Sequence, residues 1–381
     1  MSQHPLQKRI RVAVLFGGCS GEHEVSLASA RSVMSALDPT KYEIFPVGIT
    51  PSGRWLTEGD PLQQLAAGGE PDDAAGDAAG DAAPVTDLPA RGSGRELIPG
   101  TQGARFPHVD VVFPVLHGTY GEDGTVQGLL DLAGLPYVGS GVLGSALGMD
   151  KVAMKAVFRS YGLPVGDYVA VTRSAWRGRP DEIVAEVEAR LGYPVFTKPA
   201  NLGSSVGVAK AGDAHELRRG LDLAARYDRR LVVEAAINAR EIECSVLGND
   251  EPIASVPGEV VPSNEFYDYR AKYIDDASEL LIPAPLSAET TALVQELAVK
   301  AFQAIDCAGM ARVDFFLCKD SGRVYVNEVN TIPGFTDISM YPKLWAASGL
   351  PYSELIDRLI ALALERHADR RSNETRYHHD H

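Results

Sequence analysis

The chain of 381 residues is predicted to combine an α/β region with α+β regions in three domains. Two observations predict this class. Strand and helix signals alternate through the first third, which is typical of an open sheet covered by helices. The last third carries two apolar runs, residues 313–318 and 324–329, which are separated by the turn-forming sequence Asp320-Ser321-Gly322 and therefore indicate a β-hairpin.

The first domain is expected to span residues 1–139. Residues 66–104 interrupt its pattern with a stretch rich in Ala, Gly, Asp and Pro that lacks aromatic residues. We interpret that stretch as a surface insertion with a mobile centre. Apolar runs and helical periodicity predict strands at 12–16, 42–49 and 109–116, and helices at 26–37 and 125–133.

A central domain is expected at 140–235 and a C-terminal domain at 236–368, followed by a polar tail at 369–381. An aromatic and charged loop, residues 262–276, belongs to the C-terminal domain. Asp150 is predicted to be the N-cap of a helix. Central strands are predicted at 168–172, 194–198, 206–210 and 231–234, and central helices at 151–161, 180–191 and 214–225. Besides the hairpin, C-terminal strands are predicted near 243–247 and 253–256, and helices at 288–304 and 352–367.

Composition excludes several classes of protein. The net charge of −15 argues against a general nucleic-acid binder. No apolar run approaches the ~20 residues that span a bilayer, and the apolar run at 12–16 is too short for the core of a signal peptide. The four cysteines show no CxxC spacing, which predicts reduced thiols in a cytoplasmic protein rather than disulfides or a zinc site.

Acidic and amide side chains gather on the predicted hairpin. Strand alternation puts Arg312 and Asp314 on one face of the first strand, and Glu328 and Asn330 on one face of the second. Hard oxygen ligands at this density suit Mg²⁺ that holds phosphate oxygens. The alternative is a solvated face with an Arg–Asp salt bridge.

A Gly-Ser segment, residues 198–207, joins two predicted strands. Its small residues leave backbone N–H groups open to an anion, and Lys198 would add a cation. The segment does not match the P-loop pattern, and an ordinary turn is the alternative. Lys151 at a helix start strengthens the anion interpretation, because that position is unfavourable for the helix itself. The strand exit at 232–241 offers backbone groups to an adenine edge, although a plain connection would look the same.

Two glycine-rich loops follow strands of the first domain, at 16–26 and 116–124. Glu22 and Glu24 lie near a helix start and suit a ligand amine, but they also suit simple helix capping. His117 could contact an anionic or tetrahedral species, and a hydrogen-bonded loop histidine explains it equally well.

Five motifs occur in a single order along the chain, and together they resemble the D-alanine–D-alanine ligase family of ATP-grasp ligases. The resemblance runs from residue 12 to about 364 and implies an ATP-grasp fold with ATP between the central and C-terminal domains. The motifs are Gly17-Gly18-x-Ser20-x-Glu22-x-Glu24-Val25-Ser26, His117-Gly118-x-x-Gly121-Glu122-Asp123-Gly124, Met149-Asp150-Lys151, Lys198-Pro199-x₃-Gly203-Ser204-Ser205-Val206-Gly207, and Arg312-x-Asp314 with Asn327-Glu328-x-Asn330-Thr331-x-Pro333-Gly334.

The resemblance implies a nucleotide and metal site. Two Mg²⁺ ions, for which Mn²⁺ could substitute, would bind Asp314, Glu328 and Asn330. Lys151 and Lys198 are implied to bind the ATP phosphates, and Glu234, Ile237 and Glu241 to line the adenine and ribose site. Ser205 is also implied to bind the nucleotide, and Lys272 to reach ATP when its loop closes.

The resemblance also implies two D-alanine sites. Glu22 would pair with the first ammonium, and Ser204 and Tyr273 would link Glu22 to a closing loop. Arg312 and the Gly334 N–H would stabilise the tetrahedral oxyanion. The remaining substrate contacts would come from His117, Ser339 and Met340, with Ser339 receiving the second carboxylate.

The implied reaction joins two D-alanines through a D-alanyl phosphate and releases ADP and phosphate, for peptidoglycan synthesis in a bacterial cytoplasm. Tyr273 favours D-alanine over D-lactate as second substrate, and relatives imply a homodimer. Three alternatives remain: another carboxylate–amine ligase, a nucleotide-binding regulator without catalysis, and a nicotinamide oxidoreductase. The last is disfavoured because the glycines in 17–21 do not follow the GxGxxG pattern.

Overall fold

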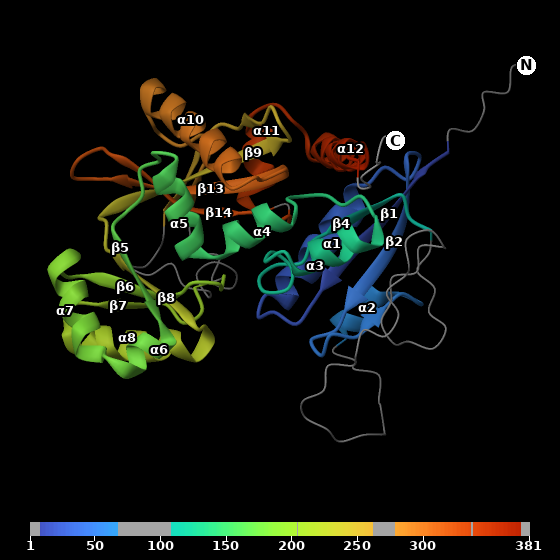
Figure 1. Cartoon of the computed structure of the whole chain (residues 1–381). Helices are drawn as coiled ribbons and strands as arrows, with labels where there is room; N and C mark the ends of the chain where they lie inside the picture. The colour runs from blue at the N-terminus through green and yellow to red at the C-terminus, as the bar shows by residue number, and fades with distance from the viewer. Residues whose placement is uncertain (1–7, 68–107, 204, 262–278, 337, 375–381) are drawn as a thin grey trace, which may run out of the picture.

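A computed structural model describes residues 8–67, 108–203, 205–261, 279–336 and 338–374. Figure 1 shows three lobes, each built on its own sheet. Within the described ranges every helix is too short or too polar to cross a bilayer. The four cysteines are free thiols, as predicted. The predicted insertion falls almost wholly, and the predicted aromatic loop entirely, outside the described residues.

The N-terminal sheet has the strand order β3-β2-β1-β4, in which β1 runs parallel to both β2 and β4. The predicted α/β arrangement is therefore confirmed, but two short elements, β3 and α2, were not predicted. The elements are β1 (Ile10–Gly17), α1 (His23–Ala36), β2 (Tyr42–Ile49), β3 (Trp55–Leu56), α2 (Pro61–Ala66), β4 (Val111–Pro114) and α3 (Thr125–Ala133).

The central sheet is antiparallel, with the order β5-β8-β6-β7. The strand predicted at 206–210 is wrong in its first half. Ser205 and Gly207 have φ values of 59° and 74°, a left-handed conformation that makes a turn, so β7 begins only at Ala209. The elements are β5 (Tyr168–Thr172), α6 (Arg173–Gly178), α7 (Pro180–Arg190), β6 (Val195–Pro199), β7 (Ala209–Ala211), α8 (Ala214–Tyr227) and β8 (Arg230–Ala235).

The C-terminal sheet follows the order β12-β11-β9-β13-β14, with β10 beside β9. The predicted hairpin is its β13–β14 pair. The final helix continues to Arg371, so the first residues of the predicted polar tail are helical. The elements are β9 (Ala239–Gly248), β10 (Ile253–Ala254), β11 (Gly258–Val261), β12 (Glu279–Leu281), α10 (Ala288–Ala304), β13 (Gly309–Cys318), β14 (Val324–Asn330), α11 (Met340–Ala347) and α12 (Tyr352–Arg371).

Two helices connect the first lobe to the others, namely α4 (Val142–Met149) and α5 (Lys151–Ser160). Met154 and Phe158 of α5 are fully buried in the apolar core beneath the C-terminal sheet, although residues from 140 onward were predicted to belong to the central domain. The helix thus packs against one lobe while its N-terminus reaches the central one.

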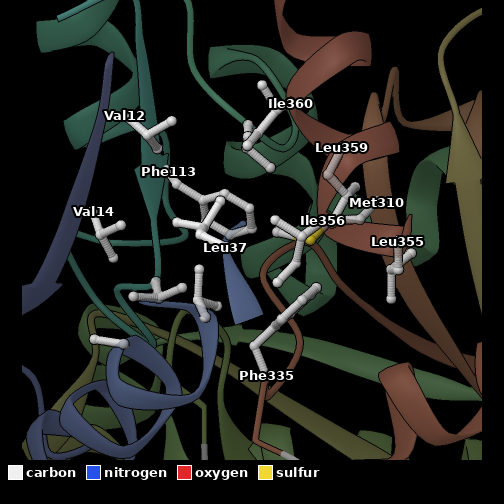
Figure 2. Packing of buried hydrophobic residues seen from close by; sticks show 14 of the residues in the cluster. Val12, Val14, Leu37, Phe113, Met310, Phe335, Leu355, Ile356, Leu359 and Ile360 are labelled. Atoms are coloured by element: carbon white, nitrogen blue, oxygen red, sulfur yellow. The ribbon is translucent and has the colours of Figure 1, made fainter. Parts of the chain in front are cut away.

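The N-terminal sheet shares its core with the end of the chain. Figure 2 shows Val12 and Phe113 beside Ile356 and Leu359 of α12, and all four side chains are fully buried. Phe335, from the segment after β14, packs edge-on against Phe113 with ring centroids 5.8 Å apart. The first and last parts of the chain therefore form one apolar unit.

Candidate active site

The hairpin presents a polar face, as its alternation predicts. Arg312 lies opposite Asn330, and Asp314 opposite Glu328, while the residues between them are buried. The Arg312 guanidinium donates twice to Asp314, at 2.7 and 2.8 Å, and Asn330 Nδ2 donates to Asp314 Oδ2 at 2.9 Å. The four predicted side chains are thus brought together, and the salt bridge offered as the alternative interpretation is present.

Glu243 adds a carboxylate that was not predicted. It lies on β9 directly beside Asp314, and its Oε2 is 2.9 Å from Arg312 Nε. Period-two alternation along β9 could have marked it as facing the same side as the hairpin residues. We call Arg312, Asp314, Glu328, Asn330 and Glu243 the hairpin cluster, in which one arginine stands against three carboxylates.

The hairpin cluster suits a cation that brings ligands of its own. In the described part of the chain no set of three His, Cys, Asp or Glu residues is arranged to hold a metal ion. A hard ion here would need the Asn330 oxygen and oxygens of a bound phosphate in addition to Asp314 and Glu328. The chemistry of this donor set, all oxygen, fits Mg²⁺ and not a thiolate- or imidazole-preferring metal.

A second charged group lies between β6, β8 and α5. Glu234 is 7% exposed, and its two oxygens lie 2.6 Å from Lys198 Nζ and 3.0 Å from Lys155 Nζ. Burial alone would raise the pKa of Glu234, but the two lysines outweigh it and hold the pKa below its usual range. We call Lys155, Lys198 and Glu234 the lysine cluster, in which two cations stand against one anion.

Lys155 was missed by the sequence reasoning. It lies one helical turn after Lys151 on α5, and this spacing could have placed both lysines on one face. Its Nζ also donates to the backbone oxygen of Asn327, at 3.1 Å. That oxygen is free of the ladder because the register shifts between Asp314 and Phe315, which leaves Asn327 as the extra residue of a bulge.

Lys151 connects the hairpin cluster with the Gly-Ser segment. Its Nζ donates to the Leu202 oxygen of the Gly-Ser segment at 2.9 Å and lies 3.7 Å from Glu328 Oε2. The predicted N-cap is confirmed, because Asp150 accepts from the N–H groups of Val152 and Ala153, and Asp150 also pairs with Arg230 of β8. The helix start is therefore fixed where one lysine reaches both the Gly-Ser segment and the hairpin cluster.

A small hollow of about 10 Å³ opens beside the lysine cluster, which is room for about one water molecule. It combines apolar walls with a few polar groups, a composition common in small-molecule sites. Glu241, on β9 opposite Phe316, adjoins its wall. The hollow is lined by Lys155, Gly166, Glu234, Ala235, Ile237, Phe316, Val326 and Asn327.

Glu22 lies where loops of two lobes meet. A Cβ atom at Gly118 would come within 2.6 Å of Glu22 Oε2, and one at Gly203 within 3.1 Å. Glycine at both positions therefore permits the close approach. Gly203 belongs to the Gly-Ser segment, so the predicted amine-binding acid lies next to the predicted phosphate-binding loop.

His117 is held by two partners within the protein. It is 4% exposed, its Nδ1 is 3.0 Å from the Ile332 oxygen, and its Nε2 is 3.0 Å from Ser29 Oγ. A carbonyl can only accept, so Nδ1 carries the proton. Burial lowers the pKa of His117, so the neutral ring then accepts from the Ser29 hydroxyl at Nε2. The hydrogen-bonded loop histidine is thus realised, and the predicted substrate contact remains a prediction.

Two of the remaining predicted residues, Ser339 and Met340, follow β14 in the chain. Ser339 Oγ accepts from Thr336 N at 3.1 Å and lies next to Gly334, where a Cβ would meet it at 2.9 Å. Met340 is buried in a small apolar cluster with Val260 and Leu344. Ser205 lies in the turn before β7. Ser204, Lys272 and Tyr273 lie outside the described residues.

Comparison with known proteins gives matches over nearly the whole chain. Residues 11–140 match the family model for the D-ala D-ala ligase N-terminus, and residues 157–361 match the model for its C-terminus. A D-alanine–D-alanine ligase from Ruminiclostridium cellulolyticum is 53% identical over 377 residues, covering 96% of this chain and 98% of that protein. One from Natranaerobius thermophilus is 50% identical over 368 residues, covering 97% of this chain and 98% of that protein.

Solved structures agree with these matches. The D-alanine-D-alanine ligase from Coxiella burnetii is 38% identical with a TM-score of 0.78, covering 96% of this chain and 97% of that one. A D-Ala:D-Ser ligase from Enterococcus faecalis is 39% identical with a TM-score of 0.80, covering 93% and 100%. The predicted ATP-grasp fold is thereby confirmed, and the chain belongs to the D-alanine–D-alanine ligase family.

Proposed function

We propose that the protein is an ATP-dependent ligase that joins two D-alanine molecules through a D-alanyl phosphate and releases ADP and phosphate. One observation carries the proposal. The lysine cluster has an excess of positive charge, the hairpin cluster has an excess of negative charge, and Lys151 contacts both Glu328 and the Gly-Ser segment that carries Lys198. A nucleotide with bound Mg²⁺ complements both signs at once.

The nucleotide would lie with its phosphates near Lys151, Lys198 and the N–H groups of the Gly-Ser segment. Its base would lie beside Glu234 and Ile237, where the small hollow offers both apolar and polar groups, and the walls of the hollow would have to part to admit it. Glu241 would reach the ribose. Ser205 and Lys272 are proposed as further phosphate contacts on the strength of the family motifs alone.

Asp314, Glu328 and Asn330 would hold two Mg²⁺ ions, for which Mn²⁺ could substitute. When bound, such ions supply charge neutralisation to phosphate oxygens during transfer. Asp314 is engaged by Arg312 and Asn330, so nucleotide binding would redistribute these contacts. A released Arg312 could then face a developing oxyanion.

The first D-alanine would place its ammonium at Glu22 and its carboxylate toward the phosphates. The amine of the second D-alanine would then attack the acyl carbon, with Arg312 and the Gly334 N–H as oxyanion donors. Ser339 would bind the carboxylate of the second D-alanine. His117 and Met340 are proposed as further substrate contacts because of the family resemblance. Ser204 and Tyr273 would couple Glu22 to loop closure, which keeps water from the acyl phosphate.

The assay is ADP release with ATP, Mg²⁺ and D-alanine, with the product identified by mass. D-Serine and D-lactate, each offered with D-alanine, test whether the second site accepts another partner, as the D-Ala:D-Ser relative does. We expect D-alanyl-D-alanine as the main product and no turnover after the divalent metal is chelated. If none of these conditions yields that dipeptide, the proposal is wrong.

The setting and assembly are also proposed from the family. A ligase that makes this dipeptide serves peptidoglycan synthesis, which implies a bacterial cytoplasm. A homodimer is expected, and sedimentation of the purified chain would decide the oligomeric state.

A further inference from the structure

The segment after β14, residues 331–335, carries Gly334 and is held mainly by side chains of the N-terminal lobe. Ile332 is fixed at both of its backbone polar groups. Its N–H donates to Glu122 Oε1 at 3.0 Å, and its oxygen accepts from His117 Nδ1 at 3.0 Å.

Glu122 bridges two loops with a single carboxylate. Its other oxygen, Oε2, accepts from the N–H of Gly118 at 2.7 Å. The loop that carries Glu122 is itself tied to α3, because Gln127 Nε2 donates to the Gly121 oxygen at 2.8 Å. The carboxylate therefore connects the loop after β4 with the loop after β14.

The other side of Gly334 is fixed as well. The N–H of Phe335 donates to Ser29 Oγ at 3.3 Å, and Tyr352 OH donates to the Phe335 oxygen at 2.7 Å. Ser29 also contacts His117, so one hydroxyl joins the two anchoring points. The backbone on both sides of Gly334 is thus pinned by polar groups from outside the segment.

A buried carboxyl group in this position costs free energy unless its hydrogen bonds are kept. Burial raises the pKa of Glu122 to about 8, and the nearby Glu22 adds to that effect, while the N–H groups of Gly118 and Ile332 act in the opposite direction. Both oxygens of Glu122 accept hydrogen bonds from backbone N–H groups, and this geometry ties the residue to the segment 331–335.

We propose that Glu122 is a positioning residue which, together with His117 and Ser29, sets the backbone of Gly334 for the second step of the reaction. This inference rests on the proposed function. Glu122 touches no reacting atom in it. Its effect passes through Ile332 to the N–H that would receive the oxyanion, where an error of about 1 Å costs about 100-fold in rate.

The test separates the two steps of the reaction in Glu122→Gln and Glu122→Ala. Dipeptide synthesis reports both steps, and D-alanine-dependent scrambling of the β,γ-bridging oxygen of labelled ATP reports the first. We expect kcat for synthesis to fall about 100-fold, with KM for ATP unchanged and with scrambling retained or increased. A purely structural role would lower both activities together with the melting temperature.

Ser29→Ala is a second, milder variant, because it removes the link between His117 and Phe335 and leaves the Glu122 carboxyl group in place. We expect the same separation of steps with a loss of about 10-fold. Tyr42→Phe is the matched control. It removes another bond between the N-terminal lobe and α12, Tyr42 OH to Asp357 Oδ1 at 2.7 Å, without touching residues 331–335.

The outcomes are distinguishable. If wild-type protein makes no dipeptide, the proposed function fails. If the wild type is active and the Glu122 and Ser29 variants keep synthesis within about twofold, or lose scrambling and synthesis in parallel, the inference is overturned. The inference is supported if the Glu122 and Ser29 variants lose synthesis but keep scrambling, and if Tyr42→Phe keeps both.

Discussion

The lysine cluster and the hairpin cluster meet at one site but differ in how their charges are satisfied. In the lysine cluster, Glu234 has a cation at each oxygen, and the Lys155 and Glu234 side chains are only 4% and 9% exposed. In the hairpin cluster, Arg312 and Asp314 are 18% and 15% exposed, and Arg312 serves more than one carboxylate. The Lys198 side chain is 16% exposed, so the two groups differ mainly in charge: two cations serve one acid in the first, whereas three acids share one arginine in the second.

The lysine cluster therefore has a structural role in addition to the nucleotide-binding role proposed above. A buried acid with two lysines is required by the fold, because either lysine alone would be costly to bury. The acids of the hairpin exceed their counter-ions, so a bound cation would relieve them. Burial alone would lower the pKa of Lys198, yet Glu234 and then Glu328 raise it, which shows that the two clusters interact.

The largest effect is expected from Glu234→Gln. Removing the one anion leaves Lys155 and Lys198 buried beside each other, which should lower the free energy of unfolding by about 3–5 kcal/mol. Urea unfolding measures it. Glu186→Gln, at an exposed pair with Arg190, is the control and should change stability by less than about 0.5 kcal/mol. If Glu234→Gln lowers the free energy of unfolding by less than about 1 kcal/mol, the lysine cluster does not differ from the hairpin cluster in its contribution to stability.

Asp314→Asn should show the opposite behaviour. It removes one negative charge from the hairpin cluster, so turnover with Mg²⁺ should fall by about 100-fold or more. The free energy of unfolding should change by about 1 kcal/mol or less. Steady-state kinetics and urea unfolding on the same samples measure both. Asp320→Asn, in the hairpin turn, is the control and should keep full activity. If the variant loses stability but keeps turnover, Asp314 has a structural role and not a metal-binding one.

Lys155→Met tests whether the lysine cluster also tunes the nucleotide site. Without Lys155, Glu234 pairs with Lys198 alone and draws it away from phosphate, so KM for ATP should rise about 10-fold while kcat changes less. Lys300→Met, in an exposed helical pair with Glu296, is the control. An unchanged KM for ATP would mean that Lys155 contributes to the stability of the fold and not to nucleotide binding.

The smallest effect concerns an ion pair remote from the site, that of Arg11 with Asp110. Hydrogen bonds from Arg11 lower the pKa of Asp110 to about 2 against the effect of burial. Because the pKa of Asp110 is lowered in the fold, the pair stabilises the protein at pH values above the unfolded pKa near 3.8. This stabilisation is lost as the pH falls toward 2. Because the pair is partly exposed, we expect about 1 kcal/mol or less.

Unfolding of wild type and Asp110→Asn between pH 2 and 7 measures this contribution. The difference should be constant above about pH 5 and vanish near pH 2. A difference that grows on acidification would reverse the sign and contradict the assignment.

Local pattern was enough for much of the fold and for part of the site. Alternation along the hairpin correctly placed Arg312, Asp314, Glu328 and Asn330 on one face, and the Asp150 cap was read from the helix start. These features depend on neighbours in sequence or on a single hairpin. Strands of two or three residues, such as β3 and β12, carry too little periodicity to be found this way.

Long-range register supplied what local pattern could not. Glu243 joins the hairpin cluster only because β9 pairs with β13, and Glu122 finds its partner at Ile332 only after two lobes dock. His117 could not be assigned from sequence, since both partners of its ring come from other elements. Each of these contacts is fixed by tertiary packing and not by spacing along the chain.

The shared core of the N-terminal sheet and α12 has a consequence for synthesis on the ribosome. Val12 and Phe113 leave the exit tunnel long before Ile356 and Leu359, which complete their packing. Domains that emerge first usually fold first, but here the leading sheet must wait for the trailing helix. We therefore expect the apolar face of the first sheet to stay uncovered until residues 352–371 have been made.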